Sequence, residues 1–184
     1  VYASNSFSTT IKGGEGDDYI ETEYGYINVE GGTGNDTIIA NQSGGFNYIF
    51  NLGDGQDVIK DTAAGSNSPS YIDTLQFGDG IVKEDLLIKK LDNDLIVEIL
   101  NTTDKITVQD WFISSYNKLE FFSFTNGESL DTLAIEEIVA TIPTTEIYGT
   151  EYDDENLLGD EVNNIIYGLA GADRMSGLAG DDVY

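Results

Sequence analysis

Two nine-residue segments place glycines and an aspartate at a spacing suited to binding a hard metal ion. Gly13–Glu21 and Gly31–Ile39 both follow the pattern Gly-Gly-x-Gly-x-Asp-x-(aliphatic)-x, and they start two nonapeptide periods apart. The glycine-rich part suits a tight turn that exposes carbonyl oxygens, and the last three residues suit a very short strand. Calcium takes roughly six to eight oxygen ligands, which stacked loops can supply from carbonyls and aspartate side chains together.

Aliphatic residues recur with the same period, which predicts coils of short strands. They are Ile11, Ile20, Val29 and Ile38. With two nonapeptides in each coil, residues one period apart lie on opposite sheets and residues two periods apart stack. Asp18 and Asp36 then share one edge, and Asp57 joins them after a short insertion. Thr22–Glu30 carries Ile27 at the aspartate position, so we expect the opposite edge to bind nothing there.

A second array with this period lies near the C-terminus. Asp154 and Asp173 are expected to share one edge, and Asn164 and Asp182 the other. The stacked pairs in both arrays predict roughly four calcium ions. The candidate metal-binding residues are Asp18, Asp36, Asp57, Asp154, Asn164, Asp173, Asp182, Gly13, Gly14, Glu15, Gly16, Gly31, Gly32, Thr33, Gly34, Gly53, Gly55, Gly168, Gly171, Gly177 and Gly180.

Composition excludes several classes of function. The 184 residues include 34 Asp or Glu against 8 Lys or Arg, for a net charge of −26, with no His and no Cys. Such a chain lacks the basic patch that nucleic acids require, and it lacks the apolar run of a transmembrane helix. Without His or Cys, zinc, copper and haem sites are disfavoured, and the oxygen donors favour calcium or magnesium. Nucleophilic catalysis also lacks its groups, and the best-placed acids are explained as ligands, so we expect no enzyme.

The nonapeptide period disappears in the middle of the chain, where strands and turns alternate. Strands are predicted at Tyr71–Phe77, Leu86–Lys90, Leu95–Leu100, Lys105–Val108 and Lys118–Phe124, with a helical turn at Val82–Leu86 and one helix at Asp131–Ala140. Asp92-Asn93-Asp94 resembles the start of an EF-hand loop, but it lacks the later ligands and is interpreted as a hairpin turn. Ala63–Pro69 and Thr141–Thr145 are predicted linkers, which divides the chain into residues 1–62, 70–140 and 146–184.

The aromatic residues of the middle segment have two interpretations. Trp111, Phe112, Phe121, Phe122 and Phe124 could form a sugar-stacking or membrane-inserting face, or they could fill the core of a small β-domain. Their spacing along strands favours the core.

The repeats resemble those of RTX proteins, the haemolysin-type calcium-binding family. Asp73–Gly80, Asp94–Val97 and Ile106–Phe112 also resemble the haemolysin-type calcium-binding-related segment that follows such repeats. This resemblance implies an all-β fold, with two right-handed parallel β-rolls flanking an intervening antiparallel β-segment with one short helix. It also implies calcium-triggered folding, and a secreted or cell-surface location in a larger toxin, adhesin or exoenzyme involved in virulence.

The same resemblance implies that the parent protein leaves the cell through a type I secretion apparatus. Val1–Thr10 lacks the features of a signal peptide, and we expect the chain to be a monomeric fragment of that larger protein. The alternative is an adhesin module that binds glycan or ice directly.

Overall fold

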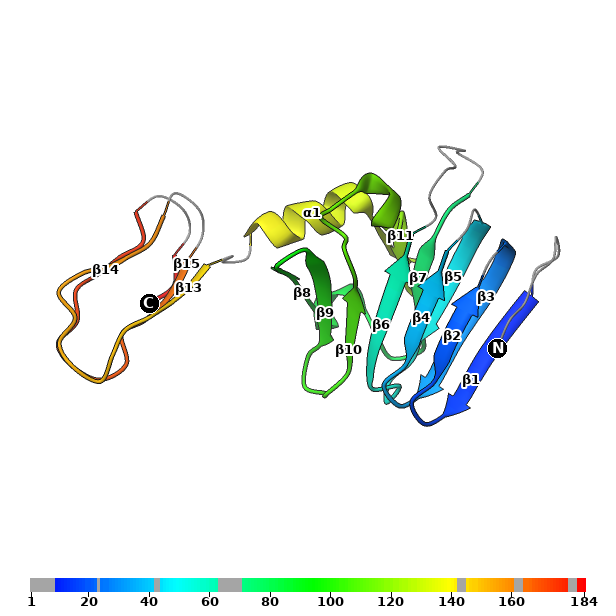
Figure 1. The fold of residues 1–184 in the computed structure, drawn as a ribbon, viewed down its shortest axis with the longest axis horizontal. Coiled ribbons are helices and arrows are strands. Elements are labelled where there is room, and N and C mark those ends of the chain that lie inside the picture. The colour runs from blue at the N-terminus through cyan, green and yellow to red at the C-terminus, as the bar shows by residue number, and fades with distance from the viewer. Residues whose placement is uncertain are drawn as a thin grey trace. The chain divides into compact units, whose positions relative to one another are not determined.

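The computed structural model of the protein describes residues 9–22, 24–41, 44–62, 71–141, 145–160, 164–178 and 182–184. The chain divides into unit 1, Val1–Ile135, and unit 2, Glu136–Tyr184 (Figure 1). The predicted linker Ala63–Pro69 and most of the predicted linker Thr141–Thr145 lie outside the described residues. Each unit is a separate stack of strands.

The described residues of unit 1 form two six-stranded sheets. The first has the spatial order β1 (Thr9–Glu15), β3 (Gly25–Thr33), β5 (Gly44–Phe50), β7 (Thr74–Phe77), β11 (Phe121–Ser123) and β12 (Ser129–Asp131). The second has the order β2 (Tyr19–Thr22), β4 (Thr37–Ala40), β6 (Gln56–Asp61), β10 (Lys105–Val108), β9 (Asp94–Ile99) and β8 (Leu86–Leu91). From β1 to β7 successive strands alternate between the sheets, so neighbours within each sheet pair in parallel (Figure 1). This arrangement is the parallel β-solenoid that the nonapeptide period predicts.

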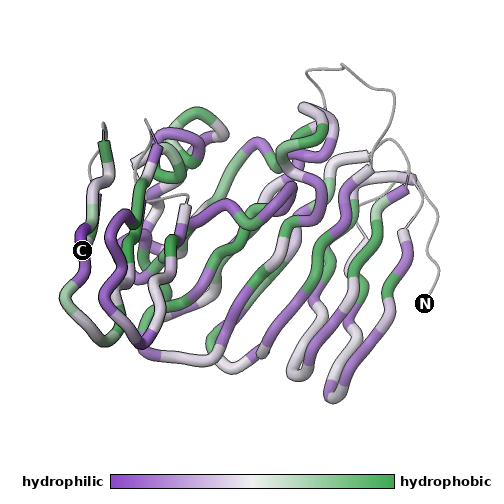
Figure 2. The backbone as a smooth tube through the Cα atoms, turned by 60° about the vertical axis from the view of Figure 1, so that its left-hand side comes forward, coloured by the Kyte–Doolittle hydropathy of each residue, from purple (hydrophilic) through white to green (hydrophobic). Residues whose placement is uncertain are grey.

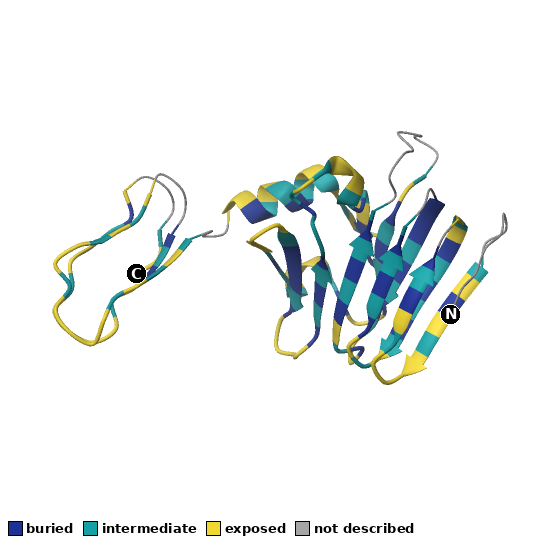
Figure 3. Ribbon diagram, in the orientation of Figure 1, coloured by how far each residue is buried: buried dark blue, intermediate teal, exposed yellow. Residues whose placement is uncertain are grey.

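Each sheet contributes apolar side chains to the core, among them a ladder that runs through five strands. The first ladder is Ile11, Val29, Tyr48, Leu75 and Phe122, and the second is Ile20, Ile38, Ile59, Val108 and Leu95. None of these residues is more than 4% exposed. Figures 2 and 3 show apolar, buried positions alternating with polar, more accessible ones along the strands. The register confirms that residues one period apart lie on opposite sheets and residues two periods apart stack.

The segment after β7 extends both sheets of unit 1. Strands β8, β9 and β10 pair antiparallel, as do β11 and β12, in agreement with the expected antiparallel segment. The turn between β8 and β9 places Asp92 at a φ of 53°, a conformation that Asp and Asn adopt in tight turns. The hairpin interpretation of that turn is therefore confirmed. In addition, β11 pairs in parallel with β7 and β10 with β6, which joins this segment to the nonapeptide coils.

The aromatic residues of the middle segment mostly form core. Trp111 and Phe122 are fully buried, with ring centroids 6.3 Å apart, and Phe124 stacks on Phe77 at 5.2 Å. Phe121 is 36% exposed and lies outside this cluster. The core interpretation is confirmed for Trp111, Phe122 and Phe124, because all three side chains are buried.

The middle segment also contains three short helical elements, two between its strands and one after them. Two are single 3₁₀ turns, η1 (Lys83–Asp85) and η2 (Ser115–Asn117), and the first occupies the predicted helical turn. The α-helix α1 (Thr132–Thr141) lies within one residue of its predicted bounds and buries Ile135 and Val139. In the ranges that the structure describes, no helix is both long and apolar enough to cross a bilayer.

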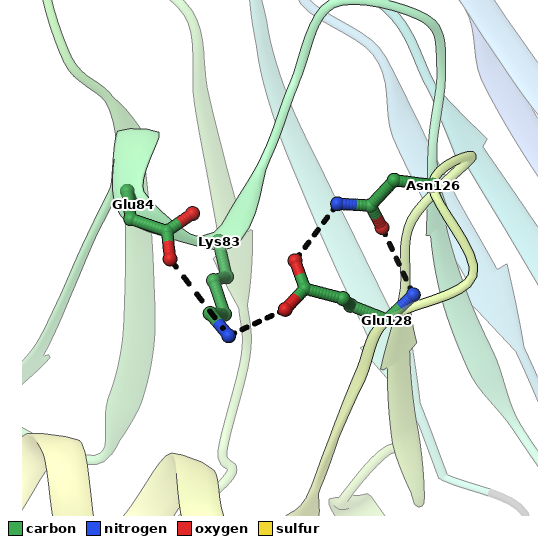
Figure 4. Close-up of polar contacts among 4 residues, drawn as sticks. All are labelled: Lys83, Glu84, Asn126 and Glu128. Carbon is green, nitrogen blue, oxygen red and sulfur yellow. Dashed lines mark hydrogen bonds and ion pairs between the residues drawn. The ribbon is translucent and has the colours of Figure 1, made fainter.

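A surface cluster links η1 to the turn between β11 and β12 (Figure 4). Lys83 pairs with Glu128, whose other carboxylate oxygen accepts a hydrogen bond from Nδ2 of Asn126 at 2.8 Å. Glu84 lies 3.8 Å from the same ammonium group. The hydrogen bond to Lys83 is the main reason that the pKa of Glu128 lies below its usual value. Because this cluster is exposed, it orients the two turns more than it stabilises the fold.

Where the structure describes unit 2, it contains two pairs of short parallel strands. They are β13 (Thr145–Tyr148) with β15 (Asn164–Tyr167), and β14 (Leu157–Leu158) with β16 (Met175–Ser176). Ile166 is buried, whereas Tyr148 and Tyr167 stack on each other at 4.8 Å on the exposed face. Unit 2 thus repeats the alternation of two short sheets with much less apolar core.

Candidate metal-binding edge

The predicted aspartates of unit 1 lie in a row along one edge of the coils. Each follows a turn that leads from the first sheet to the second, directly before β2 or β4 or within the start of β6. The backbone N–H of Asp18 donates to Oδ1 of Asp36 at 2.7 Å, and the N–H of Asp36 donates to Oδ1 of Asp57 at 2.9 Å. The carboxylates of Asp36 and Asp57 are therefore each fixed by the amide of the preceding coil, and the structure brings all three aspartates into register.

Two of the other carboxylate oxygens of this row have no partner among the described residues. Oδ2 of Asp18 and Oδ2 of Asp36 are both buried without a hydrogen bond. Each lies against the first glycine of its own loop, so that a Cβ at Gly13 would be 2.6 Å from Oδ2 of Asp18, and a Cβ at Gly31 would overlap Oδ2 of Asp36. Burying an unpaired charged oxygen is costly, and a cation is the partner that removes this cost.

Backbone carbonyls line the turns of this edge because glycines let successive coils approach closely. A Cβ at Gly32 would collide with the carbonyl of Gly14, and one at Gly34 would lie 2.5 Å from the carbonyl of Gly16. Gly14 and Gly32, the second glycines of their loops, have φ values of 117° and 104°, which side-chain-bearing residues rarely adopt. The motif therefore provides closely stacked turns lined with carbonyl oxygens.

Electrostatics along the row favour a bound cation. Burial is the main reason that the pKa of Asp36 is raised, and Asp18 and Asp17 raise it further by charge repulsion. Burial also raises the pKa of Asp57 to about 7, with contributions from Asp36 and Asp54. Among the described residues, no Lys or Arg forms a salt bridge with Asp18, Asp36 or Asp57. The pKa values of Asp36 and Asp57 are thus raised by burial and by neighbouring negative charges, which a bound cation would compensate.

The donor set fits calcium only if carbonyls contribute. Within the described ranges, no three side chains of His, Cys, Asp or Glu converge in a way that could hold a metal ion. Carboxylates alone are therefore too few for calcium, which takes roughly six to eight oxygens. The carbonyls of Gly14, Gly16 and Gly31 lie close to glycine positions of adjacent coils, and the carbonyl of Gly31 lies against Gly13 together with Oδ2 of Asp18. The residues that would hold calcium are thus Asp18 and Asp36 together with the glycine carbonyls of their loops.

The remaining predicted positions lie in or next to these turns. Gly13, Gly14 and Glu15 end β1, Gly16 follows it, Gly31, Gly32 and Thr33 end β3, Gly34 follows it, and Gly53 and Gly55 lie between β5 and β6. In unit 2, Gly168 and Gly171 lie between β15 and β16, Gly177 follows β16, and Gly180 lies outside the described residues.

The predicted pairs of unit 2 show the same bond as those of unit 1. The N–H of Asp154 donates to Oδ1 of Asp173 at 3.0 Å, and the N–H of Asn164 donates to Oδ1 of Asp182 at 3.0 Å. Asn164 differs, because its side-chain Oδ1 accepts from the N–H of Asp160 and its Nδ2 donates to Oδ1 of Asp160, each at 3.0 Å. The amide of Asn164 is thus satisfied within its own loop and is a weaker candidate ligand.

The loops of unit 2 lack glycine at their second position. Leu169 and Leu178 stand there with φ values of 66° and 72°, and both side chains are largely exposed. A left-handed conformation costs a non-glycine residue roughly 1–2 kcal/mol. Unit 2 therefore forms its turns with backbone strain that the glycines of unit 1 avoid.

Two further aspartates lie near the end of the row in unit 1, and we did not predict them from the sequence. Asp54 accepts a hydrogen bond from the N–H of Asn51 at 2.7 Å, and Asp104 accepts one from the N–H of Gly53 at 2.7 Å. The sequence contains a signal for Asp54, because glycines flank it on both sides as they do in a turn of the repeat. Asp104 precedes β10 and has no such signal, because it reaches the row only through the pairing of β10 with β6.

The opposite edge of unit 1 contains a carboxylate in only its later coils. Ile27 and Phe46 occupy the aspartate position in the first coils, and the register then places Asp73 beside Phe46 and Glu120 beside Asp73. The N–H of Phe46 donates to Oδ1 of Asp73 at 2.7 Å, and the N–H of Asp73 donates to Glu120 at 2.7 Å. Both bonds are of the same amide-to-carboxylate kind as those on the first edge. The aromatic and aliphatic residues at the first coils provide no ligand there.

Comparison with known families assigns this architecture. The family model of the RTX calcium-binding nonapeptide repeat matches residues 5–25, 28–43 and 148–184, and that of the haemolysin-type calcium binding protein related domain matches residues 94–132. The chain belongs to the RTX repeat proteins. In this RTX chain, Asp18, Asp36 and the predicted pairs of unit 2 lie within the matched repeats, whereas Asp57 lies outside them and is placed in the row by the structure.

A curated relative shares part of the RTX chain. A stretch of 97 residues is 30% identical to the iron-regulated protein FrpA of Neisseria meningitidis serogroup C. The match covers 50% of this chain and 8% of that protein. The RTX chain thus corresponds to a small part of this relative.

Proposed function

We propose that this RTX chain is a module that folds when calcium binds, within a larger toxin, adhesin or exoenzyme exported by type I secretion. The calcium-binding character follows from the repeats. The observation that carries the folding proposal is the pair of buried, unpartnered Oδ2 atoms of Asp18 and Asp36 in the stacked row. Folding without a cation would leave both oxygens desolvated and uncompensated, whereas folding with calcium would satisfy them together.

The charge of the chain supports the same mechanism. A net charge of −26 on 184 residues opposes compaction by self-repulsion. Where calcium is scarce, before export, this repulsion keeps the repeats extended. Outside the cell, calcium at millimolar concentration fills sites whose Kd is on the order of 10⁻⁴ to 10⁻³ M. At a tenfold excess over Kd, each independent site stabilises the folded state by about 1.4 kcal/mol, so several sites decide folding together.

The number of ions follows from the stacked pairs. The pairs are Asp18 with Asp36, Asp36 with Asp57, Asp154 with Asp173, and Asn164 with Asp182. We propose roughly four calcium ions, one for each pair, supplied by the carboxylates and the neighbouring glycine carbonyls. The pair containing Asn164 is expected to bind most weakly, because its amide is already engaged by Asp160.

A calcium titration followed by far-UV circular dichroism and calorimetry tests the proposal. After exhaustive chelation the chain should be expanded and poor in β-structure, and calcium should restore the β-spectrum with the binding of several ions. Magnesium at the same concentration should be less effective, because it requires a more rigid octahedral set of ligands. Identical spectra with and without calcium, in protein shown by elemental analysis to be metal-free, would contradict the proposal.

The wider context is also a proposal. A module that folds on calcium suits a secreted or cell-surface protein that passes the type I secretion apparatus unfolded, and its monomeric state is expected from its strong negative charge. Activity in the parent protein would lie in other segments, and this module would act as a non-enzymatic folding and capping element. Secretion assays with and without residues 1–184 in the parent protein test this role.

A further inference from the structure

The outer face of the first sheet of unit 1 contains a groove. Outward-facing residues on one strand are two positions apart, and neighbouring strands are about 4.8 Å apart, so the face presents rows of side chains. One row joins Tyr26 to Gly45, and the next joins Asn28, Asn47 and Thr74. These residues line a groove of about 320 Å³ across β3, β5, β7 and β11.

Glycine and aromatic residues form one end of this groove. A Cβ at Gly45 would lie 3.0 Å from the ring of Tyr26 and 3.2 Å from the backbone carbonyl of Ile72. Tyr26 is 49% exposed, and the centroid of its ring lies 5.8 Å from that of Tyr71. Because Gly45 has no side chain, the surface of the groove beside the accessible ring of Tyr26 is bare backbone.

Three amide side chains also line the groove. Nδ2 of Asn47 donates to Oδ1 of Asn28 at 3.1 Å and to Oε1 of Gln76 at 2.8 Å. This bonding fixes the three amides as a ladder and uses both N–H groups of Asn47. In the part of the chain that the structure describes, it leaves Oδ1 of Asn47 and the NH₂ groups of Asn28 and Gln76 without a protein partner. The ladder therefore offers fixed donors and an acceptor to a ligand.

We propose that this groove binds a neutral oligosaccharide. A sugar ring has an apolar face that stacks on an aromatic ring, and hydroxyl groups that both donate to and accept from amides. No charged side chain lines the groove, in a chain whose net charge of −26 repels anions. The chemistry of the lining therefore selects an uncharged, polyhydroxylated ligand over a phosphate, a sulfated glycan or a basic peptide. This binding is separate from the calcium row, which lies along one edge of the coils.

The test is a titration of the calcium-loaded full chain with cellohexaose, maltohexaose and chitohexaose, by saturation-transfer NMR and calorimetry. At least one probe should bind saturably. Tyr26→Ala should weaken this binding by about tenfold, because it removes the stacking ring. Gly45→Ala should weaken it as well, because the added methyl group would displace the ring of Tyr26. Tyr116→Ala, which removes a similarly exposed tyrosine in η2, should leave binding unchanged.

Circular dichroism spectra and calcium titrations of every variant separate this proposal from the calcium-folding proposal. A variant that keeps the β-spectrum and the calcium isotherm but loses sugar binding supports the groove, whether or not calcium drives folding. Three outcomes would overturn the proposal: no binding of any probe to folded protein, binding that Tyr26→Ala does not change, or self-association of the chain that Tyr26→Ala abolishes. The last outcome would mean that a second copy of the chain occupies this face.

Discussion

The central carboxylate of the row, Asp36, should affect stability in opposite directions with and without calcium. In Asp36→Asn the amide oxygen can still accept the hydrogen bond from the N–H of Asp18, so the main structural contact remains. The substitution removes a buried negative charge whose pKa is raised by burial and by the charges of Asp18 and Asp17. Without calcium, Asp36→Asn should therefore leave the chain equally stable or more stable.

In calcium the same substitution should be strongly destabilising. Asp36 lies between Asp18 and Asp57 and is bonded to both, so it would contribute to two sites. At a tenfold excess of calcium over Kd, each site contributes about 1.4 kcal/mol. Loss of both sites should therefore lower the free energy of unfolding by about 3 kcal/mol.

Urea unfolding in calcium-depleted buffer and in roughly 10 mM calcium measures both effects. Asp92→Asn is the matched control, because it removes the same charge from an exposed turn in unit 1 where Asn also tolerates the φ of 53°. The control should show no dependence on calcium beyond that of the unsubstituted chain. Equal losses of stability for Asp36→Asn in both buffers would refute the reasoning, because they would identify Asp36 as a purely structural residue.

Three further predictions follow from particular residues. The pKa of Asp73 is raised from a usual value of 3.8 to about 8, mainly by burial and next by the charge of Asp61. Between these two pH values the folded chain therefore retains a proton that the unfolded chain releases. The free energy of unfolding without calcium should therefore fall as pH rises from about 4 to about 8, and Asp73→Asn should reduce this slope in pH-dependent urea titrations; an unchanged slope would contradict the assignment. Leu169→Gly should relieve roughly 1 kcal/mol of backbone strain and so raise the thermal midpoint of unit 2 in calcium. A lower midpoint would show that the exposed leucine stabilises unit 2 by more than its strain costs. Gly32→Ala should destabilise unit 1 with or without calcium by more than about 1 kcal/mol, because its φ is 104° and its Cβ would collide with the carbonyl of Gly14; calorimetry showing an unchanged midpoint would contradict the stacking.

The repeat region was predictable because its information is local and periodic. A period of nine residues sets which side chains enter the core and which coil lies above which, so the register of Ile11 with Val29 and of Ile20 with Ile38 follows from counting. The same counting places Asp36 next to Asp18. The hairpin at Asp92 was also predictable, because its turn residues and flanking strands are adjacent in the chain.

The aromatic core of the middle segment was predictable in kind but not in detail. Alternation along a strand indicates that Phe122 and Phe124 are buried, yet it does not say which rings they contact. The contact of Phe124 with Phe77 depends on the parallel pairing of β11 with β7, which joins segments more than forty residues apart. No local pattern encodes such a pairing.

The sequence by itself thus determined the repeat, its two edges and the aspartates along them, because a regular solenoid repeats one local geometry. Only the tertiary structure decided which other groups reach those edges. Asp104 approaches Gly53, and Asp73 enters the register of Phe46, because long-range strand pairing brings them there. Likewise the amide ladder centred on Asn47 exists only once three coils are stacked. Periodicity specifies neighbours one coil apart, whereas contacts across insertions depend on which distant strands pair.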